Sequence, residues 1–549
     1  MKIFDNACVY NPVTGKWIPS SFSVEDGKIT TVAKPGELTG ESCTDLKGAR
    51  VIPGLIDAHI HIESTLLPPH EFGKLALSCG VTTVIADPHE IGNVAGTNGV
   101  DFMLEDAKYS AADIFFMVPS CVPATPTEIG GAVISAKDLE KYTTNERVLG
   151  LGEMMNVPGV LCGDSEVKAK LALFDRVDGH APCLGGKDLD TYIAAGIKSD
   201  HECTSAEEAR EKLEKGLWIF LREGDAAKNV ASLAPVLTPE TASRCCFATD
   251  DRHADFIRNE GTIDNAIRII TRKTCLNPSA KASGACKSGT PIETALRAAT
   301  LSPAEYFGLE DRGILAPGKL ADFCTLKKGA EFRIDRVWKN GVERRDIKEI
   351  PTKAKCASPA FSCRFPTKQD LVLPDGNLRI IGLTPGEIVT EQIIGTKKYP
   401  GAQKIVCVDR YAERGFGVGL IAGLDMKKGA IATSVAHDAH NIVASGATDE
   451  EILAAIHAVA SAKGGMTVVV DGKTTILPLD IAGLMSSLPA DEVCENLGVL
   501  AKELAKTGAQ PNAFMSLSFM CLTVIPHLKI TPRGLFDGDT FSDTDIRIE

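Results

Sequence analysis

One pattern constrains the fold of this chain more than any other: a short apolar run that ends in polar residues recurs eight times, with helical segments between several of the runs. Near-continuous apolar runs are typical of buried parallel strands, and eight alternating strand and helix units predict an α/β fold, the (β/α)8 barrel. An open doubly wound sheet is the rival, but the Gly-rich turn that usually follows its first strand is missing. The eight strand candidates are ARVIPGLIDAHIHI, VTTVIADPHE, DIFFMVPS, VLGLGEM, RVDGH, GIKSDHE, LWIFLREG and CCFATDD.

The segments that flank this repeat have a different rhythm. Residues 1–50 and 313–349 contain short strand patterns with turns, and we expect them to form one small composite β domain beside a barrel at residues 51–312. Residues 350–366 mix Pro, Lys, Ser and Cys without periodicity, which indicates a linker. We expect residues 367–549 to form a C-terminal α/β domain.

Composition and charge limit the classes of partner. The 549 residues carry a formal net charge of −13, and Lys and Arg form no basic stripe, so nucleic acid is not expected as a partner. No apolar run approaches the roughly 20 residues that span a bilayer, and the N-terminus lacks the apolar segment of a signal peptide. Most of the 17 cysteines should be reduced. We expect a cytoplasmic protein that acts on a small molecule, and we also expect a homo-oligomer.

Side chains that can bind metal stand at the ends of several predicted strands. Because side chains at i and i+2 of a strand share a face, the two histidines that end the first strand should converge on one point. The carboxyl ends of barrel strands meet at one face, where barrel active sites lie. Four imidazoles and two carboxylates suit two divalent ions such as zinc, manganese or ferrous iron. The six candidate ligands are His59, His61, Glu153, His180, His201 and Asp250.

Longer motifs around these residues resemble a known family. The chain resembles the amidohydrolase superfamily in the segments VIPGLIDAHIHIES and RGILAPGKLADF. The strand-end residues Glu153, His180, His201 and Asp250 match the same pattern. Within this superfamily, the chain resembles the adenine deaminase family over nearly its whole length. The segments that carry this resemblance are VTTVIADPHEIGNVAG, LGLGEMMNVPGV, SDHECTSAEEA, REGDAAKN, ATDDRHADFIRNEG and GVGLIAGLDMKKGAIATSVAHDAHNI. Residues 273–290 depart from the family because this connection is longer than usual; we favour a surface loop over one that shapes the barrel entrance.

The resemblance implies hydrolytic deamination of adenine to hypoxanthine and ammonia, as in purine salvage, by water that bound metal activates. The first two histidines would bind one ion and the last two the other, with Glu153 bridging both. Asp250, beside the first ion, would accept a proton from the water and pass it to the leaving ammonia. Manganese or ferrous iron is the expected metal, with zinc as an alternative.

Other polar residues at the strand ends are candidates for contact with the base. Attack at C6 of adenine places electrons on N1, so an acid near N1 should help, and Glu90 and His89 at the end of the second strand are the candidates. Arg222, Asp251 and His253 follow the seventh and eighth strands. They are expected to shape the purine pocket or to pair with one another.

Two questions remain open at this level. His437, Asp438 and His440 could form a further metal site or a hydrogen-bonded turn, and we favour the turn. The chain could also be another amidohydrolase that acts on a cyclic amide or a related nucleobase, or a barrel scaffold without catalysis. Cyclic-amide barrels more often carry a Lys where Glu153 stands, and a scaffold would be expected to lose ligands that this chain retains.

Overall fold

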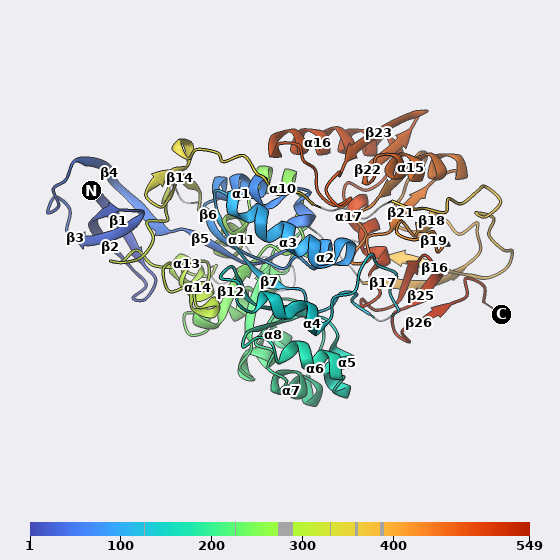
Figure 1. Cartoon of the computed structure of the whole chain (residues 1–549), viewed down its shortest axis with the longest axis horizontal. Coiled ribbons are helices and arrows are strands. Elements are labelled where there is room, and N and C mark those ends of the chain that lie inside the picture. Colours follow the sequence, from blue (N-terminus) through green and yellow to red (C-terminus); the bar gives the residue numbers. More distant parts are fainter. Residues whose placement is uncertain are drawn as a thin grey trace, which may run out of the picture.

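The structure is a computed structural model (Figure 1), and its described residues are 1–125, 127–225, 227–272, 289–329, 331–356, 361–384 and 389–548. All but the last two residues of the loop expected at 273–290 lie outside these ranges.

The central part of the chain forms a closed parallel barrel, as predicted. Within the described ranges, strands β5–β9 form one sheet and β10–β12 another, and all neighbours are parallel. Hydrogen bonds join the two sheets at both edges. The Lys198 amide donates to the Val177 carbonyl (3.0 Å), and the amides of Thr249 and Asp250 donate to the His59 carbonyl (3.2 and 2.9 Å). The strands are β5 (Leu55–Ile60), β6 (Val81–Ala86), β7 (Asp113–Val118), β8 (Val148–Met154), β9 (Val177–Gly179), β10 (Ser199–Asp200), β11 (Trp218–Arg222) and β12 (Cys245–Ala248).

The barrel is apolar at one end and polar at the other. Ile56, Ile85, Met117 and Phe220 belong to one buried cluster together with side chains of helix α14 (Leu301–Phe307), which follows the last strand. This packing leaves the opposite, carboxyl ends of the strands for polar side chains. The helical elements of this region are η1 (Ile62–Thr65), α1 (Pro69–Ser78), α2 (His89–Ala95), α3 (Thr97–Asp106), η2 (Ala107–Tyr109), α4 (Ala136–Leu139), η3 (Glu140–Tyr142), α5 (Val157–Cys162), α6 (Ser165–Leu171), α7 (Gly186–Ala194), α8 (Ala206–Glu214), α9 (Val230–Leu233), η4 (Ala234–Val236), η5 (Ala242–Arg244), α10 (Ala254–Glu260), α11 (Ile263–Thr271) and α13 (Ile292–Ala298).

A separate sheet combines strands that precede the barrel with strands that follow it. Its order is β15-β14-β13-β4-β1-β2-β3, and it lies at the left of Figure 1. Phe4, Phe22, Phe323 and Trp338 form its aromatic core, with Phe323 stacked on Trp338 at 4.6 Å between ring centroids. The domain boundaries drawn from the sequence stay predictions. The elements are β1 (Lys2–Asn11), β2 (Lys16–Glu25), β3 (Lys28–Ala33), β4 (Ser42–Pro53), β13 (Phe323–Leu326), β14 (Ile334–Lys339), β15 (Val342–Glu343) and η6 (Arg344–Asp346).

The C-terminal part, orange to red in Figure 1, is built on a sheet of order β17-β16-β19-β18-β21-β20-β22-β23 and a smaller sheet of β24-β25-β26. Helix α16 packs on barrel helices α1 and α10, so the two parts are in direct contact. The elements are β16 (Leu378–Leu383), β17 (Thr390–Gly395), β18 (Ala402–Val408), β19 (Phe416–Ala422), β20 (Ala430–Thr433), β21 (Ile442–Gly446), α15 (Asp449–Ser461), β22 (Gly465–Val470), β23 (Lys473–Pro478), α16 (Ala490–Thr507), α17 (Ala513–Ser518), η7 (Phe519–Cys521), β24 (Leu528–Thr531), β25 (Gly534–Asp537) and β26 (Ser542–Thr544).

Among the described residues, no helix combines the length and the hydropathy needed to cross a bilayer.

Candidate active site and metal centre

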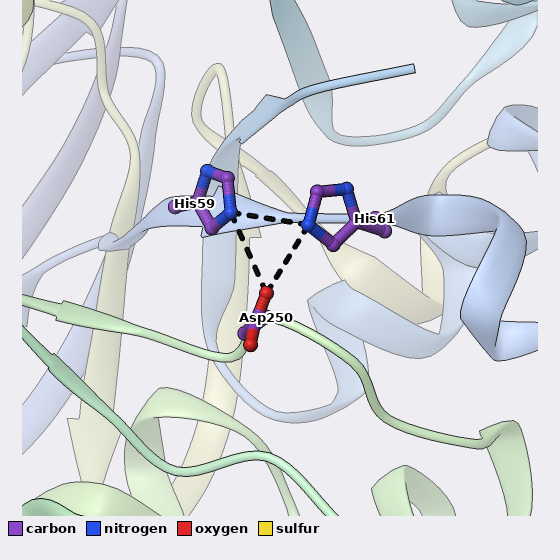
Figure 2. Close-up of side chains that lie close together, drawn as sticks. All are labelled: His59, His61 and Asp250. Carbon is purple, nitrogen blue, oxygen red and sulfur yellow. Dashed lines mark hydrogen bonds and ion pairs between the residues drawn. The ribbon is translucent and has the colours of Figure 1, made fainter. Parts of the chain in front are cut away.

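Three of the predicted ligands converge at the junction of the first and last barrel strands. Figure 2 shows His59 and His61 from the end of β5 turned toward Asp250, which follows β12. The Nε2 atoms of the two histidines lie 3.2 Å apart, and Oδ1 of Asp250 lies 3.5 Å from His59 Nε2 and 3.1 Å from His61 Nε2. Three donor atoms directed at one point form a candidate metal site.

Glu153, at the end of β8, stands between this group and the other two predicted histidine ligands. Its Oε1 lies 3.3 Å from His61 Nε2. Its Oε2 lies 2.7 Å from His180 Nδ1 and 3.0 Å from His201 Nε2. One carboxylate thus faces His61 with one oxygen and both His180 and His201 with the other, an arrangement that suits a ligand shared by two ions.

The ligands are held by a layer of hydrogen bonds behind them. The carbonyl of Asp87 lies 3.0 Å from Nδ1 of His61, so Nδ1–H can donate to it and Nε2 stays free as a ligand. The carboxylate of the same residue accepts the Glu153 amide at 2.9 Å. Asp57 accepts the Thr249 amide at 3.1 Å, which ties β5 to the strand that carries Asp250.

Burial and electrostatics at this site fit a divalent cation. Every one of the six predicted ligands is buried, with at most 8% of any residue exposed. Burial and the neighbouring His201 lower the pKa of His59 to about 4, so its imidazole is neutral. Neighbouring carboxylates raise the pKa of His61, His180 and His201 against the effect of burial. Buried carboxylates that face one another need a compensating cation. Four imidazole nitrogens and two carboxylates are a donor set that zinc, manganese and ferrous iron accept.

Arg222, predicted to shape the pocket, is part of an ion-pair network around the metal ligands. Its guanidinium donates to Asp250 Oδ2 at 2.9 Å and to both oxygens of Glu202, with 3.0 Å between Nη2 and Oε2. The other oxygen of that carboxylate, Oε1, lies 3.4 Å from Nε2 of His201. Asp251 accepts a hydrogen bond from Ser64 beside the same cavity.

His253 lies apart from the metal ligands. It follows β12 by a few residues and lines a neighbouring, smaller pocket together with His437. The two pockets share His437, so a contact between His253 and the base stays a prediction.

The C-terminal part of the chain reaches into the site, which the sequence left open. Glu90, in the first turn of α2, contacts Nδ1 of His437 through Oε1 and Nε2 of His440 through Oε2. His89 lies between the two parts, with Nδ1 3.4 Å from Glu153 and Nε2 3.8 Å from Asp438 Oδ1. The turn favoured for residues 437–440 therefore binds a barrel carboxylate.

One cavity connects these groups. Side chains of the candidate metal ligands and of the C-terminal part line it together, including His61, Glu153, Asp250, His437 and Asp438. Its apolar wall consists of Phe519, Leu522 and Ile525. An apolar wall with a few convergent polar groups is typical of a small-molecule site.

Comparison with known proteins identifies the family. The amidohydrolase family model matches residues 50–344, and the model of the adenine deaminase C-terminal domain matches residues 387–542. An adenine deaminase of Methanoculleus marisnigri is 48% identical over 96% of this chain and 99% of its own length. This chain belongs to the adenine deaminase family.

Other relatives extend the similarity over the same span. An adenine deaminase of Methanoregula boonei is 45% identical over 99% of this chain and 96% of its own length. Adenine deaminase 2 of Carboxydothermus hydrogenoformans is 40% identical over 98% of this chain and 96% of its own length. The match of both domains, rather than the barrel alone, sets this adenine deaminase family member apart from the wider amidohydrolase superfamily.

Sequence reasoning missed some residues of the site in this adenine deaminase family member. Glu202 directly follows His201 at a strand end, and that position could have indicated its role. Phe519, Leu522 and Ile525 carry no such signal, because apolar residues are more often part of a core than of a binding site.

Proposed function

We propose that this protein hydrolyses adenine to hypoxanthine and ammonia. The observation that carries the proposal is one cavity in which five of the six candidate metal ligands, all but His59, meet side chains of the C-terminal domain. That domain is the part of the chain matched by the model of the adenine deaminase C-terminal domain. The relatives that match the chain over nearly its full length are named adenine deaminase.

The metal centre would hold two divalent ions, manganese or ferrous iron, with zinc as an alternative. His59 and His61 would bind one ion, His180 and His201 the other, and Glu153 would bridge them. Bound ions of this kind lower the pKa of water from 15.7 to about 7 and so supply a nucleophile at neutral pH.

We propose that Asp250 transfers a proton from the attacking water to the leaving amino group. Its Oδ1 lies within 3.5 Å of both His59 and His61, and its Oδ2 is paired with Arg222. The Arg222 guanidinium and the hydrogen bonds from the histidines lower the pKa of Asp250 against the effect of burial, so the carboxylate is ionised and can accept a proton from the attacking water. It would then pass this proton to the amino group that leaves C6.

The remaining predicted residues are proposed to bind the base. Arg222 and Asp251 line the cavity beside Asp250, while Glu90 and His89 line it from α2. His253 approaches from the neighbouring pocket. We also propose a cytoplasmic location. We further propose a homo-oligomer, which sedimentation of the purified protein would test.

The test is ultraviolet spectroscopy of the purified, manganese-loaded protein with adenine, and with dihydrouracil as a competing substrate class. The proposal predicts hypoxanthine and one ammonia for each adenine consumed. A double variant, His59→Ala with His61→Ala, should lose metal, as measured by elemental analysis, and turnover together. Faster hydrolysis of dihydrouracil than of adenine would rule the proposal out.

A further inference from the structure

Residues 437–440 bring a pair of histidines from the C-terminal domain to one barrel carboxylate. Glu90 contacts His437 through one oxygen and His440 through the other, across 347 and 350 positions of sequence. All three residues are buried, at 1–2% exposure. In Figure 1 helix α2, which carries Glu90, runs toward the orange and red C-terminal domain.

The proton positions on His440 follow from its hydrogen bonds. The Ala436 amide donates to Nδ1 of His440 at 3.1 Å, so Nδ1 is an acceptor and the proton sits on Nε2. Nε2–H then donates to Oε2 of Glu90. The Tyr411 hydroxyl donates to the Ala439 carbonyl at 2.7 Å and fixes the same turn. His440 therefore holds Glu90 and has no ring nitrogen left for a ligand.

His437 differs from His440 in one respect that matters for chemistry. Its Nδ1 is engaged by Glu90, but its Nε2 is buried and has no hydrogen-bond partner among the described residues. The ring is stacked on Phe519 at 4.6 Å with 18° between the planes, and it lines the cavity that contains Glu153 and Asp250. A histidine oriented by a carboxylate beside a substrate cavity, with its second nitrogen unpartnered, is a recurring arrangement for proton transfer.

We propose that His437 is the catalytic residue that protonates N1 of the purine, with Glu90 and His440 as its positioning residues. This inference rests on the proposed adenine deamination. Both oxygens of Glu90 are occupied by histidines, so the carboxylate orients and charges His437 rather than donating a proton itself.

The protons balance over the reaction. The His437 imidazolium gives its Nε2 proton to N1 as the water oxygen bonds to C6, and the C6–N bond then breaks as ammonia leaves. Of the two water protons, one passes through Asp250 to the leaving amino group. The other, released to solvent as the nucleophile forms, restores the imidazolium. Hypoxanthine keeps the proton on N1.

The charges around His437 support the imidazolium. Glu90 and His440 face it from α2 and from its own turn, while Asp251, Asp438 and His89 lie along the same cavity. Burial by itself would lower the pKa of His437, but the carboxylates of Glu90 and Asp251 raise it to about 9. The histidine is then charged below that pH and loses its proton as the pH rises through it.

The test compares two single glutamine substitutions with one control in the full-length, manganese-loaded protein. The His437→Gln substitution should lower kcat for adenine by at least about 10²-fold, with KM changed less than threefold, metal content unchanged and Tm near that of the wild type. His440→Gln should lower kcat by less than about tenfold, because Glu90 keeps its contact with His437. The His457→Gln substitution, at an exposed histidine of α15, is the matched control and should leave kcat unchanged.

Each other outcome is decisive. Turnover by His437→Gln within tenfold of the wild type, or equal losses in His437→Gln and His440→Gln, would overturn the proposal. A large loss in His89→Gln with none in His437→Gln would assign the donor to His89 instead. If the wild type itself fails to consume adenine, the proposed function has failed rather than this inference.

If His437→Gln does not fold, the variant Glu90→Gln still tests the proposal. Glu90→Gln preserves the shape of the side chain but removes the charge that holds the imidazolium. The alkaline limb of the kcat/KM profile should move to lower pH in this variant, because the donor loses its proton earlier. An alkaline limb at the wild-type position would contradict the role of His437.

Discussion

Asp250 shows how much chemistry is concentrated in one residue at the site. It has a left-handed backbone, with φ of 61°, two positions after the end of β12. Asp and Asn are the residues that best tolerate this conformation apart from Gly. An Asp250→Asn change therefore preserves the backbone and one side-chain oxygen while removing the negative charge.

We expect Asp250→Asn to lower kcat by at least about 10²-fold, because an amide cannot accept the proton of the attacking water. Arg222 keeps its ion pair with Glu202 in this variant, so the change in Tm should be small. Thermal melting and turnover measured on one preparation check this. Near-normal turnover together with a lowered Tm would show that Asp250 has a structural role only.

At the residue scale, the sequence predicted which candidate metal ligands lie close together, but it did not predict every residue that contacts them. His59 and His61 share a strand face by the period of two, and their contact follows from that rule. Glu202 was missed because it stands one position beyond the expected ligand His201. A one-residue step in a strand normally turns a side chain to the opposite face, but β10 ends at Asp200, so the rule does not apply there.

At the scale of elements, the strand ends place the ligands and close packing between strands fixes them. Gly152 in β8 lies against Asp87, and a Cβ at this position would meet Asp87 Oδ2 at 2.1 Å. The same carboxylate holds the backbone of Glu153. A methyl group at Gly152 must therefore displace the Asp87 carboxylate, which holds the backbone of the proposed bridging ligand Glu153.

We expect Gly152→Ala to weaken metal binding by about 10–100-fold, the usual cost of disturbing the residues behind a ligand. Overpacking should also cost about 1–3 kcal/mol of unfolding free energy. Gly498→Ala in α16 is the matched control, since nothing lies within 4 Å of its added Cβ, and it should stabilise by about 0.5–1 kcal/mol. Metal competition and thermal melting measure both effects; unchanged metal affinity in Gly152→Ala would refute the account.

The order of strands and helices in the barrel was readable from the sequence because each strand is a local apolar run. The shortest strands, β9 and β10, have three and two residues, yet their polar ends still marked them. The pairing that closes the barrel, between β12 and β5, follows only from the count of eight units.

At the scale of the whole molecule, the site is completed by two parts of the chain that fold from distant sequence. No local period encodes the contact of Glu90 with His437, 347 positions away, so the sequence left the role of residues 437–440 open. Phe519, Leu522 and Ile525 of the C-terminal part line the same cavity, and each is nearly fully buried.

This enclosure predicts that adenosine is a poor substrate, because its ribose adds bulk where the C-terminal domain closes the cavity. We expect kcat/KM for adenosine to be lower than for adenine by at least about 10²-fold, as when a closed pocket rejects an added group. Parallel assays with the two substrates at one protein concentration measure the ratio. Comparable values would mean that the cavity opens wider than the structure shows.

The proposed deamination depends most directly on a centre of two ions built from the six strand-end ligands. The most direct measurement starts from metal-free protein and follows hypoxanthine formation as Mn²⁺ is added in known equivalents. We predict no turnover without metal, a rise with added Mn²⁺ and a plateau at two equivalents per chain. A plateau at one equivalent, or full turnover in the metal-free protein, would contradict it.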